Sequence, residues 1–335
     1  MDPLLTVSPS PHIHSGLSVP QIMRIVIIAL MPALLLSVYT FGPSALLMTM
    51  LAVFSCLLAE LIIGRFLLGK PDTVIDGSAV VTGILLAFNV PSNLPWYIMM
   101  IGSFVAMGIG KLSFGGLGNN PFNPALVGRV FLLISFPVQM TSWPRAEFNL
   151  SLDATTSATP LGMIKDGLRA GEQIPEMMLQ MPSYTEMFFG LHGGSLGEVS
   201  AFALLLGLGY MLFKRIITWH TPAAVVVTVF ALTLVFWLID PQRYANPVFH
   251  LLSGGVLLGA IFMATDYVTS PVTHKGMVVF GVGIGAITVL IRLFGSYPEG
   301  ISFAILIMNA FVPLINRYFL PEPFGNSKQK SVSPK

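Results

Sequence analysis

Long apolar runs alternate with short polar or glycine- and proline-rich stretches along nearly the whole chain. A helix that crosses a bilayer needs about 20 apolar residues, and fewer when it is broken or surrounded by protein. The runs form two groups of five, separated by a polar segment at 139–195. We predict spans at residues 22–41, 44–64, 77–90, 96–111, 125–137, 196–215, 222–239, 248–264, 276–294 and 301–319.

The number of runs in each group predicts how the two groups are related. Five crossings carry the chain from one side of the membrane to the other, so the second group starts on the opposite side. The pattern therefore predicts an all-α polytopic membrane protein built from two inverted five-helix repeats. We expect a lead-in at 1–20, repeats at 21–138 and 196–320, a loop at 139–195 between them, and a tail at 321–335.

Glycine and proline interrupt corresponding segments of the two groups. The third segments read DGSAVVTGILLAF and LLSGGVLLGAIFMATDY, and the fifth segments follow the loops GGLGNNPFNP and FGSYPEG. Such interruptions at matching positions are typical of broken or half-length helices that line a cavity. Glycine also permits close packing of intact helices, so the pattern alone leaves both interpretations open.

The composition agrees with a membrane protein. Of the 335 residues 54% are hydrophobic and only 10% are charged, less than half the usual charged fraction of a soluble domain. The net charge of +2 is too small for a nucleic-acid-binding protein. The single cysteine, Cys56, lies in an apolar run and is expected to be a small buried residue, which excludes an intrachain disulfide.

The basic residues predict the orientation. If the N-terminus is cytoplasmic, eleven of the seventeen basic residues fall on the inner side, and beyond the 139–195 loop only Arg243 and Arg292 lie near outer helix ends. The eleven are Arg24, Arg65, Lys70, Lys111, Lys214, Arg215, Lys275, Arg317, Lys328, Lys330 and Lys335. Both termini are then cytoplasmic and the 139–195 loop is outside.

The 139–195 segment is long for a structureless loop, so we expect it to be functional or to contain short helices. Its stretch 163–182 has apolar residues near helical spacing and could lie along the outer membrane surface. Its stretch SLDATTSATPL at 151–161 carries five hydroxyls and one carboxylate. Taken alone, this stretch is typical of a solvated loop.

Ionisable residues inside spans are costly and are candidates for function. The acidic candidates for an ion pathway or a quinone site are Glu60, Asp76, Asp266 and Glu299, and the basic candidate is Arg129. They form no nucleophile–base set, and we predict no catalytic residue and no metal site. GVGIGAI at 281–287 resembles a dinucleotide-binding fingerprint, but its position inside a span indicates helix packing.

Three carboxamides lie together in GNNPFNP at 118–124, at the entrance of the fifth span. Asn119, Asn120 and Asn123 could cap the helix or satisfy broken backbone. They could equally supply donors and acceptors to a planar ligand such as a flavin or quinone.

Four of these stretches, in this order and spacing, resemble a known family. DGSAVVTGILLAF, GGLGNNPFNPALVGRVFLL, MATDYVTSP and YPEGISFAILIMN are similar to the RnfD subunits of the ion-translocating ferredoxin:NAD oxidoreductase (Rnf) complex and to the related NqrB subunits of the sodium-pumping NADH:quinone reductase. The resemblance covers residues 15–319. The short N-terminal lead-in favours the Rnf branch.

The resemblance implies a covalent flavin. The family's outer loop carries the motif Asp-x-x-Ser/Thr-Gly/Ala/Ser-Ala-Thr, and a flavin transferase of the ApbE type joins FMN to its last threonine through a phosphoester. Asp153, Thr156, Ser157, Ala158 and Thr159 match this motif, with Ser157 where glycine is usual. Thr159 is then the acceptor, and Asp153 is read by the transferase.

The resemblance also implies a role in electron transfer coupled to Na⁺ or H⁺ translocation in the bacterial inner membrane. The expected partners are a second covalent-FMN subunit, other membrane subunits, iron–sulfur and NADH-binding subunits, and the transferase. A second, non-covalent riboflavin is expected at Asn119, Asn120, Asn123 and Arg129. The alternatives are an NqrB-type subunit and a solute channel, since the ten-span inverted repeat also resembles urea transporters.

Overall fold

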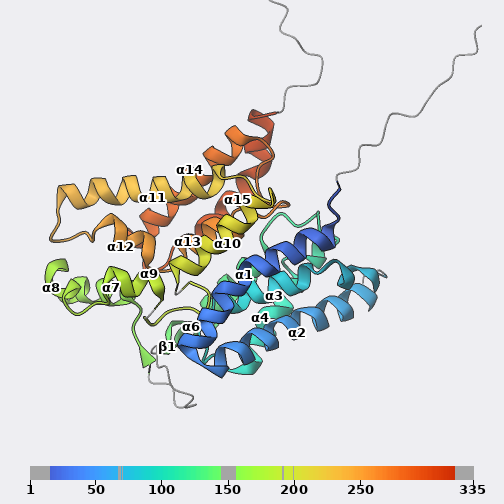
Figure 1. The fold of residues 1–335 in the computed structure, drawn as a ribbon, viewed down its shortest axis with the longest axis horizontal. Helices are drawn as coiled ribbons and strands as arrows, with labels where there is room; N and C mark the ends of the chain where they lie inside the picture. The colour runs from blue at the N-terminus through green and yellow to red at the C-terminus, as the bar shows by residue number, and fades with distance from the viewer. Residues whose placement is uncertain are drawn as a thin grey trace, which may run out of the picture.

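The computed structural model describes residues 16–66, 69, 71–144, 156–190, 192–198 and 200–320. The described chain is an elongated bundle that is almost entirely helical (Figure 1). Six of its helices are long and apolar enough to cross a membrane, and three shorter apolar helices accompany them. The prediction of a mostly helical, polytopic membrane protein is confirmed in this respect.

Each of the first five predicted spans contains a helix. The elements are α1 (Val19–Phe41), α2 (Pro43–Phe66), the 3₁₀ helix η1 (Pro71–Asp76), α3 (Ser78–Phe88), α4 (Trp96–Gly108), the 3₁₀ helix η2 (Leu112–Phe114) and α5 (Pro124–Ser135). α3 has only 11 residues and α5 has 12, so both are half-length helices. Gly77, at φ 80, precedes α3 in the left-handed region that glycine adopts without strain.

The second group also combines long and short helices, and one of its predicted spans is broken. Its elements are α10 (Ala201–Phe213), α11 (His220–Ile239), α12 (Pro247–Leu252), α13 (Val256–Leu258), the π-helical turn η3 (Gly259–Met263), α14 (His274–Phe294) and α15 (Ile301–Tyr318). The predicted span 248–264 is thus divided between α12 and α13, at the glycine pair of the motif LLSGG. Gly254 makes the turn at φ +66, so the glycines here break the helix.

The segment between the two groups contains short helices, as its length predicts. It consists of α6 (Pro137–Thr141), β1 (Trp143–Pro144), β2 (Thr156–Ser157), α7 (Pro160–Ala170), α8 (Ile174–Met178) and α9 (Tyr184–Phe189). β1 and β2 pair antiparallel. A separate apolar cluster that includes Leu161, Ile164, Met177 and Met187 also contains Phe249, which anchors this segment on α12. α7, α8 and α12 therefore gather at one end of the molecule (Figure 1).

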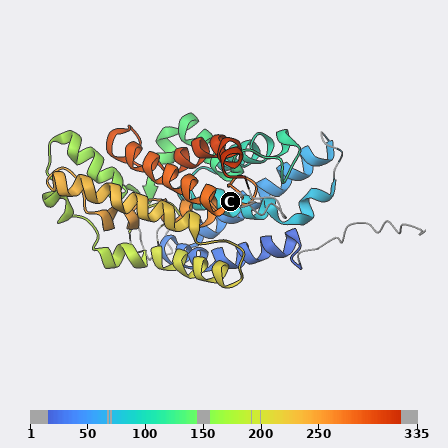
Figure 2. The same cartoon turned by 90° about the horizontal axis from the view of Figure 1, so that it is seen from above.

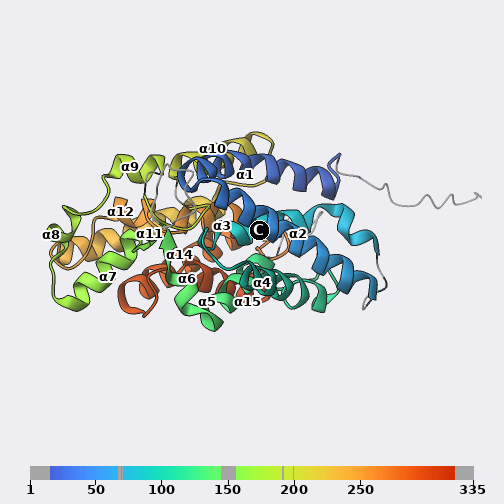
Figure 3. The same cartoon turned by 90° about the horizontal axis from the view of Figure 1, so that it is seen from below.

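The two groups of helices contact each other through corresponding members. α1 packs on α10, and the two lie side by side in Figures 2 and 3, the first in blue and the second in yellow. α5 contacts α15 in the same way. Within the groups, α2 contacts α3 and α4, and α11 contacts α12 and α14. The same neighbours recur in both groups.

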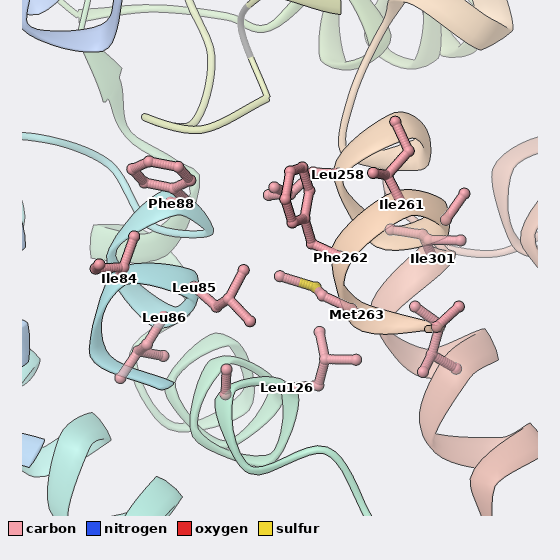
Figure 4. Close-up of a cluster of buried hydrophobic side chains, with 14 of the residues drawn as sticks. Ile84, Leu85, Leu86, Phe88, Leu126, Leu258, Ile261, Phe262, Met263 and Ile301 are labelled. Atoms are coloured by element: carbon pink, nitrogen blue, oxygen red, sulfur yellow. The ribbon is translucent and has the colours of Figure 1, made fainter. Parts of the chain in front are cut away.

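One apolar core joins the two groups. Leu85 and Phe88 of α3 face Leu258, Phe262 and Met263 of α13 and η3 in Figure 4. Leu126 of α5 and Ile301 of α15 lie in the same cluster. The halves are thus packed together through their short and broken helices.

Two predictions about single features are confirmed. Cys56 is fully buried and not in a disulfide. In GVGIGAI, a methyl carbon on Gly281 would lie 2.7 Å from Ala224 Cβ, and one on Gly285 would lie 2.7 Å from Thr228 Cβ. These glycines let α14 approach α11 closely, so the motif serves helix packing.

Candidate functional site

Thr159 occupies the N-cap of α7. Its backbone is extended, with φ −67 and ψ 153, and its Oγ1 accepts a hydrogen bond from the Gly162 amide at 3.1 Å. Pro160 follows at the first helical position, where its fixed φ favours a helix start and no amide hydrogen is needed. Just before it, Ser157 of β2 pairs with Trp143 of β1. The hydroxyl is therefore held between a strand pair and a helix start, and remains partly exposed.

A cavity of about 370 Å³ opens beside this hydroxyl. Its walls come from α5, α6, α7 and the loop before α15. The polar residues of its lining are Arg129, Thr141, Thr159, Lys165, Asp166, Arg169, Ser296, Tyr297 and Glu299. A second cavity of about 620 Å³ adjoins it and shares Lys165, Arg169, Ser296 and Pro298. Both volumes lie within the ~300–1,000 Å³ range of small-molecule sites.

Arg129 and Glu299 form an ion pair on the floor of the cavity. The Arg129 guanidinium on α5 donates to the Glu299 carboxylate and to the Ser302 hydroxyl of α15. Arg129 is 4% exposed, and its Nε has no partner among the described residues. A buried guanidinium is stable only when paired, and here the partners come from the other half of the chain.

The Glu299 carboxylate also caps the broken helix. Its Oε1 accepts from the amide of Gly255, the N-cap residue of α13, at 2.8 Å. Arg292 of α14 lies alongside, and its Nη1 and Nη2 donate to the carbonyls of His250 and Ser253 at 2.5 and 2.8 Å. The break in the span thus leaves backbone amides and carbonyls without helical partners, and charged side chains form hydrogen bonds with them instead.

Glu198 belongs to the same cluster, although the sequence analysis did not single it out. It is 4% exposed, and its Oε1 accepts from the Ser195 amide at 3.2 Å. An acidic residue near the start of the predicted span 196–215 was the signal that could have identified it. Arg292 had been expected near an aqueous helix end and is instead 6% exposed, because it binds the carbonyls at the break.

Lys165 is the cation of the cavity that lacks an acidic partner among the described residues. Its ammonium donates to the carbonyls of Tyr297 at 2.5 Å and Ile291 at 3.4 Å. Burial, with smaller contributions from Arg169 and Arg292, lowers the pKa of Lys165 from 10.5 to about 8. At neutral pH it remains mostly charged and faces the space beside Thr159.

The asparagine cluster does not border the Thr159 cavity. Asn123 caps α5, accepting from the Ala125 and Leu126 amides at 3.1 and 3.4 Å, and donates to the Met263 carbonyl at 3.3 Å. Asn120 is also buried, whereas Asn119 is exposed. The capping interpretation is therefore correct for Asn123.

The structure separates these carboxamides from Arg129. Asn120 and Asn123 line a cavity of about 80 Å³, and Arg129 does not border it. This volume is well below the ~300–1,000 Å³ of ordinary ligand sites and does not fit a flavin in this conformation. Arg129 instead pairs with Glu299 at the Thr159 cavity, so it and the asparagines border different cavities, and the second flavin stays a prediction.

The acidic candidates fall into three places. Glu60 pairs with Lys111 at 2.5 Å, and Lys111 also donates to the Ser78 hydroxyl at 2.6 Å. Asp76 accepts from the Ser78 amide at 2.7 Å. Asp266 borders the asparagine cavity, and only Glu299 reaches the Thr159 cavity. Lys111 had been counted among the charges at inner helix ends, but it is 1% exposed because it compensates Glu60.

The remaining motif positions are described only in part. Asp153 lies outside the described residues, as do most of the lead-in and the tail at 321–335. The backbone of Thr156 and Ser157 forms β2, and Ala158 is exposed. Among the described residues no group of three or more His, Cys, Asp or Glu side chains could hold a metal ion.

Comparison with known proteins assigns the chain to a family. The family described as NQR2, RnfD, RnfE matches residues 6–325. The chain belongs to this family. The resemblance found from the four sequence stretches is therefore confirmed.

Three relatives within the family illustrate the similarity. The D subunit of the Na⁺-translocating ferredoxin:NAD⁺ oxidoreductase complex of Acetobacterium woodii is 48% identical, over 97% of both chains. The D subunit of the proton-translocating ferredoxin:NAD⁺ oxidoreductase complex of Clostridium ljungdahlii is 42% identical, also over 97% of both. The D subunit of the ion-translocating oxidoreductase complex of Erwinia tasmaniensis is 38% identical, over 97% of this chain and 99% of the relative. The similarity spans both helix groups and the segment between them.

Proposed function

We propose that the chain is the RnfD-type membrane subunit of an ion-translocating ferredoxin:NAD oxidoreductase complex, and that it carries FMN covalently on Thr159. The names of the relatives support the complex. The motif residues and the cavity at Thr159 support the flavin. The chain relays electrons for a multi-subunit enzyme that moves Na⁺ or H⁺, and has no such activity alone.

The observation that carries this proposal is the setting of the Thr159 hydroxyl. It lies at the start of an 11-residue helix, where the free amides and the helix dipole favour an anion. It also opens on a cavity in which Lys165 has no acidic partner among the described residues. A phosphodiester on Thr159 would supply the negative charge that this arrangement lacks. The neighbouring space of about 370 and 620 Å³ is large enough for a flavin.

The chain's own residues would hold the group in distinct ways. Lys165 and Arg169 would face the phosphate, while Arg129 would place a hydrogen-bond donor at the cavity floor. When bound, FMN supplies one-electron and two-electron redox chemistry, and the protein supplies its position and electrostatics. Small residues around the acceptor, Ala158 and Gly162, leave room for a transferase to reach the hydroxyl.

The architecture we propose is ten membrane segments in two inverted repeats, as in urea transporters. The recurrence of neighbours supports it: α1 meets α10, α5 meets α15, and the α2–α4 pair corresponds to α11–α14. We place both termini in the cytoplasm and Thr159 outside, where the flavin transferase and a second covalent-FMN subunit would reach it. The iron–sulfur and NADH-binding subunits are the other partners.

The test is in-gel ultraviolet fluorescence of the full-length chain, co-expressed with a flavin transferase and denatured before electrophoresis. We expect a fluorescent band for the wild type and for Thr141→Ala, which alters a cavity hydroxyl that is not the acceptor. Thr159→Ala should be dark. Thr159→Asp should also be dark but keep the N-cap, which separates loss of the acceptor from about 1 kcal/mol of lost capping.

Two results would overturn the proposal. A dark wild type in the presence of active transferase would leave the solute-channel alternative, which has no use for a flavin. A fluorescent Thr159→Asp protein would place the attachment at another residue.

A further inference from the structure

Two glutamates from distant parts of the chain meet at the broken helix: Glu198, which is buried, and Glu299, whose side chain is 13% exposed. A methyl carbon placed on Gly255 would lie 3.1 Å from Glu198 Oε2 and 3.8 Å from Glu299 Oε1. The two carboxyl groups also lie within hydrogen-bonding distance of each other. Glu198 precedes α10 and Glu299 precedes α15, so the pair joins the two N-terminal ends of helices from the second group.

The donors around the pair are unevenly distributed. Glu299 accepts from Arg129 and from the Gly255 amide, so both of its oxygens are supplied with donors. Glu198 Oε1 accepts from the Ser195 amide, but Glu198 Oε2 has no donor from any other described residue. A buried carboxylate oxygen without a hydrogen-bond donor costs free energy, and so does the repulsion between two neighbouring carboxylates. One proton placed between the two carboxyl groups removes both costs.

Charged groups face this pair from every neighbouring element. They are Arg129 on α5, Arg292 on α14, and, across the Thr159 cavity, Lys165, Asp166 and Arg169 on α7, with the His250 ring behind Arg292 on α12. Arg129 and Arg292 provide positive charge for two ionised carboxylates if the shared proton leaves. The pair can therefore hold a proton or release it without leaving a buried charge uncompensated.

The pair is also connected to the candidate site. Glu299 lines the cavity beside Thr159, and Glu198 lies behind it, away from the cavity. A proton on the pair is therefore one side chain away from the space beside Thr159.

We propose that Glu198 and Glu299 share a single proton and exchange it with the Thr159 cavity. When negative charge enters the cavity with an electron from a one-electron reductant, the O–H bond of the Glu198–Glu299 pair breaks and its proton passes to the reduced group, which acts as the base. The pair then remains as two carboxylates held by Arg129 and Arg292. When the group in the cavity is reoxidised, the proton returns to the Glu198–Glu299 pair. This redox role rests on the proposed flavin at Thr159, whereas the shared proton does not.

The shared proton can be tested without flavin. The full-length chain, purified from cells that lack a flavin transferase, is examined by infrared spectroscopy for the C=O stretching band of a protonated carboxyl group. We expect Glu198→Gln to remove one such band that the wild type shows at neutral pH. Glu186→Gln, which changes an exposed glutamate in the capping box of α9, should leave it unchanged. An identical protonated-carboxyl spectrum for Glu198→Gln and the wild type would overturn the shared proton.

A second variant guards against misfolding of Glu198→Gln. Gly255 has φ −74, which alanine tolerates, and its added methyl group would press on the Glu198 carboxyl group at 3.1 Å while only touching that of Glu299 at 3.8 Å. We expect Gly255→Ala to shift the same infrared band without removing any charge. An unshifted band in this variant would also contradict the pair.

The redox role has its own readout. In the flavinylated complex, the midpoint potential of the covalent flavin should depend on pH less steeply in Glu198→Gln than in the wild type, with equal in-gel fluorescence. An unchanged slope would refute the proton exchange even if the infrared band is present. A chain without covalent flavin would refute the proposed function and leave the infrared result to decide the pair.

Discussion

Arg129 on α5 is buried, and its partners Glu299 and Ser302 come from the second half of the sequence. A guanidinium at this depth is costly unless it is paired and hydrogen-bonded. Glu198 and Arg292, which belong to the same cluster of charges, are also buried. At the scale of single residues, the site is a set of charges that depend on one another.

Replacing Arg129 with methionine should therefore destabilise the protein strongly. The change leaves Glu299, whose side chain is only 13% exposed, without its cation, which should cost up to about 3–5 kcal/mol. We expect the double variant Arg129→Met/Glu299→Gln to lose less than Arg129→Met alone, because the uncompensated carboxylate is then gone. Ser302→Ala removes only one neutral partner and should cost about 1 kcal/mol. Thermal or denaturant unfolding in detergent measures all three, and a double variant as unstable as the single one would contradict this account.

Lys165 makes the stability depend on pH in a defined window. Its pKa is about 8 in the folded protein, against 10.5 for an ordinary lysine. Between these values the unfolded chain binds more protons than the folded one, so the free energy of unfolding should rise with pH from about 8 to 10.5. The comparison is the unfolding midpoint of the unflavinylated wild type against Lys165→Met across this range. We expect the wild type to become more stable relative to Lys165→Met as the pH rises. A difference between their unfolding midpoints that stays constant would contradict the burial of the ammonium.

Glycines act differently in different helices. Gly254 breaks the span between α12 and α13 at φ +66, whereas Gly281 and Gly285 lie inside an intact α14 and allow it to approach α11. From the sequence both interpretations of a glycine-rich span were open. The tertiary contacts decide between them. α14 continues through its glycines because it packs against α11, whereas the chain turns at Gly254 because side chains bind the backbone groups that the break leaves without helical partners.

The packing role predicts opposite effects for two glycine substitutions. A methyl carbon on Gly281 would lie 2.7 Å from Ala224 Cβ and 2.9 Å from the Thr221 carbonyl oxygen. Gly281→Ala should therefore destabilise the chain by about 1–3 kcal/mol through overpacking. Gly209 in α10 has no atom within 4 Å of the same position, so Gly209→Ala should be neutral or stabilise by up to about 1 kcal/mol. Equal effects on the unfolding midpoint would refute the close α11–α14 approach.

The two groups of helices form one body because their short helices share a core. Phe88 at the end of α3 is fully buried, and it fills the space beside Gly197, where a methyl carbon would lie 2.2 Å from Phe88 Cβ. The 156–190 segment covers one end of this body and places Thr159 next to α5 and the loop before α15. The candidate site thus depends on both groups and on the segment between them.

Removing the Phe88 ring should therefore affect the whole molecule. Phe88→Ala leaves a cavity between the two groups and should cost up to about 3–5 kcal/mol. Phe213→Ala is the matched control, because that ring is 81% exposed and has little packing to lose. Unfolding followed by fluorescence and by protease sensitivity should show both groups lost in one transition at a lower temperature. Destabilisation of the first group alone would contradict the shared core.

The sequence by itself determined the membrane class, the positions of the apolar helices and the family. Backbone groups in a bilayer must be satisfied within each helix, so spans appear as local runs that can be read without knowing their neighbours. The stretch around Thr159 is also local, since its residues are contiguous. For the same reason the short helices of the 139–195 segment were foreseeable.

Only the tertiary structure decided which charged residues meet. Arg129 follows Asn123 by a few positions, yet it pairs with Glu299, 170 residues away, whereas Asn120 and Asn123 border a different cavity. Glu198 joins the cluster through the turn at Gly254 and Gly255. Such partners depend on how helices cross and where they break, because the energy of a buried charge is set by neighbours that are distant in sequence.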